Sequence, residues 1–103
     1  MKTLLELKAD ILKALAHPNR IRIVEALRCE ETCNCELAPS LGLEQSNLSR
    51  HIALLLQTGI IAARKEGVKT FYRVVDPDVF TILDLVQNIV KKRAEAQLAM
   101  LNS

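Results

Sequence analysis

Aromatic residues are scarce in this chain, which has no Trp, one Tyr and two Phe among 103 residues. No apolar run approaches the roughly 18 residues that cross a bilayer, and the sequence has no repeat, low-complexity tract, phosphate loop or cofactor motif. These absences predict one domain over residues 1–103, with no membrane partner and no organic cofactor.

The chain also has little excess charge, because 14 basic and 12 acidic residues leave a net charge of +2. That value is too small to indicate a nucleic-acid partner by itself. Neither His17 nor His51 has an evident nucleophile and orienting carboxylate nearby in sequence, so we do not expect an enzyme. The first residues carry Glu6 and Asp10 where a secretory signal would be apolar, which predicts a cytoplasmic location.

Aliphatic residues are abundant, and hydrophobic residues make up 50% of the sequence. A chain of this length buries only about two thirds of the surface that its unfolded form exposes. The aliphatic excess therefore predicts that a partner subunit covers part of the apolar surface, with a homodimer as the simplest case.

Apolar residues at helical spacing predict most of the secondary structure. Pro18 suits the first position of a helix, with His17 as a capping or surface residue, and Gly42 suits a helix end. Two short β-type runs surround Gly67-Val68, which predicts a hairpin. The expected elements are helices at 4–15, 18 to about 28, 36–41, about 45–58 and about 77–98, and strands at 60–66 and 69–75.

This order predicts a fold that is mainly α with a small β-hairpin, α-α-α-α-β-β-α. The helix pair at about 36–58 forms a helix-turn-helix candidate and the hairpin at about 60–75 a wing. Residues 44–75 hold five basic residues against two acidic ones. Polar side chains at the start of the fourth helix offer the donors and acceptors that base edges and phosphates need, which favours binding of double-stranded DNA.

Several runs of residues resemble the ArsR/SmtB family of winged helix-turn-helix regulators. They are His17-Pro18-Asn19-Arg20-Ile21-Arg22-Ile23, Ser46-Asn47-Leu48-Ser49-Arg50-His51-Ile52, Leu56 to Gly59, Arg64-Lys65-Glu66-Gly67 and Tyr72-Arg73. The resemblance implies a repressor that dimerises through its first and last helices, binds a promoter operator and is released by an inducer.

The resemblance also implies the DNA-binding residues. It places Gln45, Ser46, Asn47, Ser49 and Arg50 in or near the major groove, and Arg64, Lys65 and Lys69 on the wing. His51 is expected to pack or to touch a phosphate rather than to read a base.

The inducer is predicted from the three cysteines, Cys29, Cys33 and Cys35. Arsenical sensors of this family often carry Cys-x-Cys-Asp-Leu-Cys before the recognition helix, and Cys33 to Leu37 matches its first part. Ala38 takes the place of the third cysteine, and Cys29 is the expected replacement. Trivalent arsenic or antimony prefers three thiolates, so this count suits As(III) or Sb(III) better than tetrahedral zinc, with another soft ion as the alternative. On a regular helix Cys33 and Cys35 would point roughly 200° apart, so they can bind one ion only if the helix start is distorted. Pro39 is expected to keep residues 33–35 irregular.

Two other functions fit the same cysteines. A thiol-redox or persulfide-responsive repressor would bridge Cys29 to Cys33 or Cys35 and would need only two thiols. A thiol protein that buffers metal ions would have no DNA role, and would show no salt-sensitive binding to duplex DNA.

Overall fold

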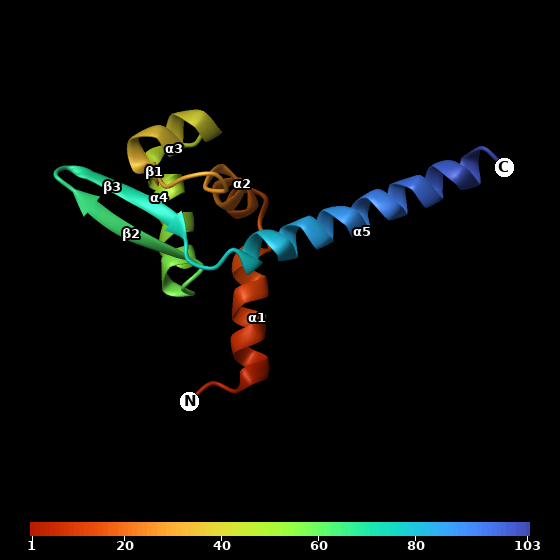
Figure 1. The fold of residues 1–103 in the computed structure, drawn as a ribbon, viewed down its shortest axis with the longest axis horizontal. Helices are drawn as coiled ribbons and strands as arrows, with labels where there is room; N and C mark the ends of the chain where they lie inside the picture. Colours follow the sequence, from red (N-terminus) through yellow and green to blue (C-terminus); the bar gives the residue numbers. More distant parts are fainter.

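The computed structural model describes all residues 1–103 and has five helices and three strands (Figure 1). The elements are α1 (Leu4–Leu15), α2 (Pro18–Ala26), β1 (Thr32–Cys33), α3 (Asn34–Leu41), α4 (Gln45–Gln57), β2 (Ile61–Glu66), β3 (Lys69–Val74) and α5 (Asp78–Leu101). The predicted order of helices and hairpin is confirmed. The strand β1 is an addition, because the sequence predicts no strand before residue 60.

The sheet is antiparallel, with the strand order β1-β3-β2. Strands β2 and β3 form the wing, and β1 lies along the free edge of β3 with Cys33 opposite Phe71. A two-residue strand has little apolar periodicity, so only the pairing with β3 defines it. The sheet therefore connects the cysteine segment directly to the wing.

The core lies between α2, α3, α4 and the start of the sheet. All 15 buried residues are hydrophobic, and Leu48, Ile52 and Leu55 form the buried stripe of α4 that the sequence predicts. Ile23 and Val24 from α2 join the same cluster. This packing fixes α4 so that its opposite face points to solvent.

The turn between α3 and α4 forms at Gly42, which ends α3 with φ +66°. This left-handed conformation favours glycine, and the N–H groups of Gly42 and Leu43 donate to the carbonyls of Pro39 and Ala38. The expectation that α3 starts at Glu36 is wrong, because Cys33 is its N-cap and Asn34 its first residue. Pro39 removes only the N–H that would bond the Cys35 carbonyl, so the helix continues through Cys35.

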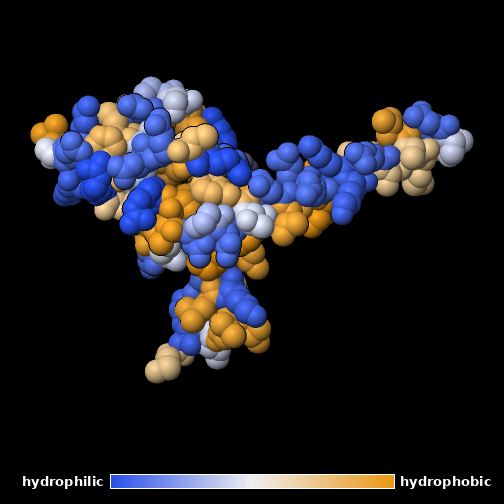
Figure 2. Space-filling model, in the orientation of Figure 1, coloured by the Kyte–Doolittle hydropathy of each residue, from blue (hydrophilic) through white to orange (hydrophobic).

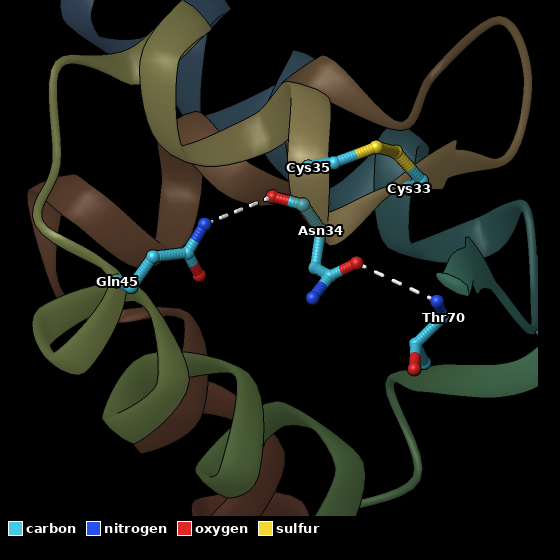
Figure 3. Close-up of a disulfide and its surroundings, with 5 residues drawn as sticks. All are labelled: Cys33, Asn34, Cys35, Gln45 and Thr70. Carbon is cyan, nitrogen blue, oxygen red and sulfur yellow. Dashed lines mark hydrogen bonds between the residues drawn. A yellow bond between two sulfur atoms is a disulfide. The ribbon is translucent and has the colours of Figure 1, made fainter. Parts of the chain in front are cut away.

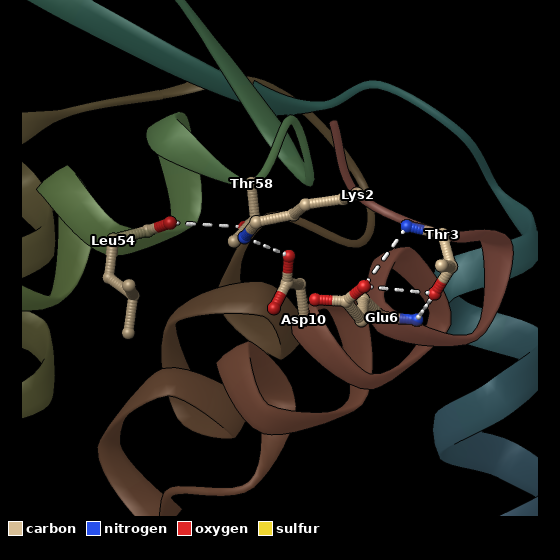
Figure 4. Close-up of polar contacts among 6 residues, drawn as sticks. All are labelled: Lys2, Thr3, Glu6, Asp10, Leu54 and Thr58. Atoms are coloured by element: carbon tan, nitrogen blue, oxygen red, sulfur yellow. Dashed lines mark hydrogen bonds and ion pairs between the residues drawn. The ribbon is translucent and has the colours of Figure 1, made fainter.

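Helix α1 has a well-formed start (Figure 4). The hydroxyl of Thr3 accepts from the Glu6 backbone N–H at 3.2 Å, and the Glu6 carboxylate accepts from the Thr3 N–H, which completes a capping box. The Lys2 ammonium pairs with Asp10 at 2.6 Å. Helix α1 is therefore ordered from its first turn, although most of its leucines face solvent.

Helix α5 projects far from the body of the molecule (Figure 1). The radius of gyration is 16.2 Å, against about 13 Å for a compact chain of this size. Only Val79 and Leu83 of its 24 residues are buried. The Arg28 guanidinium anchors the helix, because it binds Asp84 at 2.9 Å and lies over the Phe80 ring.

Apolar side chains remain exposed on the two outer helices, and Figure 2 shows them along one edge of α5 and over α1. On α1 they are Leu4, Leu5, Leu7 and Leu12, and on α5 they include Leu85, Val86, Ile89, Val90 and Leu98. These are the two helices through which the family resemblance implies dimerisation. None of the helices is both long and apolar enough to span a membrane.

Candidate nucleic-acid interface and thiol segment

The exposed face of α4 carries the side chains predicted to read DNA. Gln45, Ser46, Ser49 and Arg50 are exposed, while Asn47 is half-buried at the flank of the helix. This division follows from the buried stripe, since residues that are not in line with Leu48, Ile52 and Leu55 must point away from the core. The helix thus offers hydroxyl, amide and guanidinium groups on one continuous face.

The wing residues differ in how free they are. Lys65 and Lys69 lie near its tip, both are exposed, and neither has an ion-pair partner. Arg64, in contrast, pairs with Glu66 at 2.7 Å, donates to Glu31 at 3.0 Å through Nε and lies over the Phe71 ring. These carboxylates hold the pKa of Arg64 above its usual value. Arg64 therefore fixes the wing against the segment before β1, and the two lysines carry the unpaired charge near the tip.

His51 lies on the flank of α4 that faces α2, where it packs against His17 and Arg20. Its ring centroid is 4.5 Å from that of His17, and its Nδ1 is 3.3 Å from Nη1 of Arg20. Burial lowers the pKa of His51, and the nearby charges of His17, Arg20 and Arg50 lower it further. The imidazole is therefore neutral near pH 7, and with Arg20 donating to Nδ1 the proton is on Nε2.

His17 caps α2, as expected, because its Nδ1 accepts from the Asn19 backbone N–H at 3.0 Å. His17, Asn19 and Arg20 line a pocket together with three residues of α4, which are Asn47, Arg50 and His51. Sequence reasoning assigned no DNA contact to the three α2 residues. In the sequence, only their membership of the His17–Ile23 run pointed to a role for them. The packing of α2 against α4 is what brings them beside the recognition helix.

The three cysteines do not converge on one site. Cys33 and Cys35 form a disulfide across one intervening residue, whereas Cys29 is free and exposed. No group of three or more His, Cys, Asp or Glu side chains is placed to hold a metal ion. The bridge predicted between Cys29 and one of the other cysteines is therefore wrong for this structure, because Cys33 and Cys35 are bonded to each other and Cys29 is free.

Asn34 lies between the two bridged cysteines and contacts both DNA-facing elements (Figure 3). Its backbone carbonyl accepts from the Gln45 side-chain amide, and its side-chain Oδ1 accepts from the Thr70 backbone N–H, each at 3.5 Å. These bonds are long and therefore weak. Together with the Arg64–Glu31 pair, they link the thiol segment to the first residue of α4 and to the wing.

Comparison with known proteins agrees with this geometry. Residues 17–63 match the model of the family described as "Bacterial regulatory protein, arsR family". An uncharacterised HTH-type transcriptional regulator of Mycobacterium tuberculosis, Rv0081, is 37% identical over 99 residues, which are 95% of this chain and 87% of the relative. Its crystal structure superposes with a TM-score of 0.83 at 34% identity, over 95% of this chain and 99% of the other.

Two further relatives bear on assembly and signal. The arsenical resistance operon repressor of Staphylococcus aureus is 32% identical over 79% of this chain and 75% of its own length. The homodimeric winged helix-turn-helix DNA-binding domain of Mb0332 from Mycobacterium bovis has a TM-score of 0.80 at 30% identity, over 90% of this chain and 86% of that one. The fold and site thus define a winged helix-turn-helix transcriptional regulator, not an enzyme. This chain belongs to the arsR family of bacterial regulatory proteins.

Proposed function

We propose that this regulator is a cytoplasmic, dimeric repressor whose affinity for operator DNA depends on the redox state of Cys33 and Cys35. The observation that carries the proposal is the disulfide between these residues, on the segment whose Asn34 contacts α4 and the wing. A change at the two sulfur atoms acts on backbone that is already bonded to both DNA-facing elements. Cys29, which takes no part in the bridge, is not needed for this response.

The oxidised state is the one that we expect to bind DNA weakly. In the disulfide form, the Gln45 amide donates to the Asn34 carbonyl instead of pointing to a base. Gln45 is the first residue of α4 and is exposed, so its amide is otherwise available to the major groove. Reduction frees the segment from the short ring and lets Gln45 contact DNA.

The oxidant class that we propose is a peroxide, because Cys35 is exposed and can react with it while Cys33 is buried beside it. The exposed Cys35 thiol loses its proton and attacks the peroxide as a thiolate, which gives a sulfenic acid and a hydroxide, and the hydroxide takes up the released proton to form one water. The Cys33 thiol then attacks the Cys35 sulfur and displaces a second water. Two thiols and one hydrogen peroxide thus yield one disulfide and two waters, and a dithiol reductant reverses the change.

The test uses fluorescence anisotropy of the reduced protein on a labelled duplex from its own promoter, without oxygen. Hydrogen peroxide should raise Kd by about five- to 150-fold, the range of a typical allosteric coupling. The Cys33→Ser and Cys35→Ser variants should lose this response, and the matched Cys29→Ser variant should keep it. Equal loss in all three variants, or a Kd unchanged by peroxide, contradicts the proposal.

A second candidate inducer is trivalent arsenic, favoured by the arsenical repressor among the relatives. In the reduced protein Cys33 and Cys35 supply two thiolates, and Cys29 is a third free thiol on the same segment. Soft thiolates suit As(III) or Sb(III). The described arrangement does not fit a three-thiolate site as it stands, because two of the sulfur atoms are bonded to each other and Cys29 does not join them.

Arsenite titration of the same reduced complex separates the two candidates. Release of DNA at one arsenite per chain, weakened by each of the three Cys→Ser changes, would support the three-thiolate inducer. Release by peroxide alone would support the redox signal. Thiol chemistry without any salt-sensitive binding to duplex DNA would instead indicate a metal-buffering protein.

The dimer is proposed from the exposed apolar faces of α1 and α5. Residues such as Leu7, Leu12, Ile89 and Val90 are 50 to 60% exposed, on helices that project from the core. Contiguous apolar surface of this kind marks a protein interface. Symmetry then places two copies of α4 at successive turns of an inverted repeat, about 34–36 Å apart.

A further inference from the structure

We propose that the pocket between α2 and α4 binds one backbone phosphate of the operator, so that α2 takes part in DNA binding. The inference rests on the DNA-binding function above and assigns it a second contact surface. The pocket has a volume of about 420 Å³ and is lined by His17, Asn19, Arg20, Asn47, Arg50 and His51. All six are polar, two are guanidinium groups, and none is a carboxylate, which is the composition that suits an anion.

The position of the pocket matches where a phosphate lies. Successive residues of a helix are about 100° apart, so Asn47 and His51 lie on one flank of the exposed face and Gln45 and Ser49 on the other. The first flank faces α2 and the second faces α3, since Gln45 contacts Asn34. When the exposed face of α4 enters the major groove, its α2 flank meets the phosphates that border the groove.

The hydrogen bonds inside the pocket leave donors for an anion. Nδ1 of His17 accepts from Asn19 N–H, and Nδ1 of His51 faces Arg20, so in both rings Nε2 is the nitrogen that can donate. The Arg20 Nε donates to the Ala14 carbonyl at 2.6 Å and fixes the guanidinium in place. The pocket is therefore preorganised, with imidazole N–H groups beside fixed positive charge.

The charges around His51 are uncompensated without DNA. Arg20 and His17 face it from α2 and Arg50 lies beside it on α4, and no acidic side chain lines the pocket. The lowered pKa of His51 reflects its burial and these positive neighbours. A phosphate would supply the missing negative charge and make charge-assisted hydrogen bonds with the two arginines.

Asn19→Asp is the test variant, because it places a carboxylate in the pocket at nearly the same volume. Asp in the first turn of a helix is favourable, and its oxygen still accepts from the Arg22 guanidinium as the Asn19 oxygen does. Folding should therefore be unaffected. The matched control is Asn102→Asp, which makes the same change at the far end of α5.

With the reduced protein and a labelled promoter duplex, Asn19→Asp should raise Kd by at least about tenfold, the worth of a charged hydrogen bond. The slope of log affinity against log salt should fall by about one per pocket, thus by about two for a dimer. Asn102→Asp should change neither quantity. An unchanged Kd and slope in Asn19→Asp overturns the proposal.

A second measurement separates a phosphate contact from general repulsion. Duplexes with one methylphosphonate at each backbone position should show one position per half-site where neutralisation weakens the wild type but not Asn19→Asp. If the ratio of the Kd of Asn19→Asp to that of the wild type is the same for every methylphosphonate duplex, the pocket holds no specific phosphate. If the wild type itself shows no salt-dependent binding, the DNA-binding function fails rather than the pocket.

Free phosphate is the remaining source of the same chemistry. Inorganic phosphate added without DNA should leave the imidazole nitrogen NMR signals of His17 and His51 unchanged below millimolar concentration. Tight binding of free phosphate together with a flat methylphosphonate profile would assign the pocket to a soluble anion and overturn its role at the operator.

Discussion

Helices α4 and α5 both carry apolar stripes at helical spacing, yet only one of the stripes is buried. In α4 the stripe Leu48, Ile52 and Leu55 is at most 4% exposed. In α5 the stripe is buried only at Val79 and Leu83, and Ile89 and Val90 are more than half exposed. The same sequence pattern thus serves folding within the chain in α4 and, in the dimer that we propose, association with a second chain in α5.

The cysteine segment and the recognition helix α4 also differ in what determines their structure. Helix α4 is determined by local periodicity, whereas β1 and the start of α3 are determined by pairing with β3. The cysteine segment is therefore part of the wing's sheet, so the change that we propose at its sulfur atoms would reach the wing without crossing the core.

Leu55→Ala tests the buried side of the comparison and should have the largest effect. Leu55 is 0% exposed, so truncation leaves a cavity and should lower the free energy of unfolding by about 2–5 kcal/mol. The neighbouring Leu56, which is 37% exposed, is the matched control, and its change to Ala should cost under about 1 kcal/mol. Urea denaturation at a fixed protein concentration measures both, and equal losses would show that α4 is not packed as described.

Ile89→Asp tests the exposed side. A carboxylate buried against an apolar partner helix costs at least about 2 kcal/mol, so the dimer dissociation constant should rise about 30-fold or more. Unfolding of the monomer should change by less than about 0.5 kcal/mol, because Ile89 is 56% exposed there. Sedimentation at several concentrations measures the effect, with Asn88→Asp, about 100° round the helix, as the control. A dimer equally stable in both variants would place the interface elsewhere.

The smallest effect concerns pH and the histidine at the flank of α4. Burial lowers the pKa of His51, so the folded state favours its neutral form. Below the unfolded value of about 6.5 the unfolded chain takes up the proton first, and stability falls as the pH decreases. His51→Gln should lose less thermal stability between pH 7 and 5 than the wild type. An identical pH dependence in the two proteins would contradict this account.

Much of the fold could be predicted from the sequence because it depends on local patterns. The spacing of Leu48, Ile52 and Leu55, the proline at 18 and the glycines at 42 and 67 all act within a few residues. The exposed DNA-facing side of α4 follows from the same spacing. The resemblance of His17–Ile23 and Ser46–Ile52 to a known family supplied the function of that face.

The thiol site could not be predicted as fully, because the contacts of its segment with Gln45 and Thr70 are not local. The sequence predicts one site formed by Cys29, Cys33 and Cys35, whereas in the structure Cys33 is bonded to Cys35 and Cys29 is free. The sequence likewise predicts that Arg64 is a free charge on the wing. The fold pairs it with Glu31, which is 33 residues away in the chain.

By itself, therefore, the sequence determined the helices, the hairpin and the polar face of α4, since periodicity and turn residues act over one or two turns of chain. The tertiary structure alone decided which elements the cysteine segment contacts, which wing charge is neutralised, and that α2 and α4 enclose a pocket with two arginines and two histidines. Those features need residues that are distant in sequence to meet, and only the packing of the core brings them together.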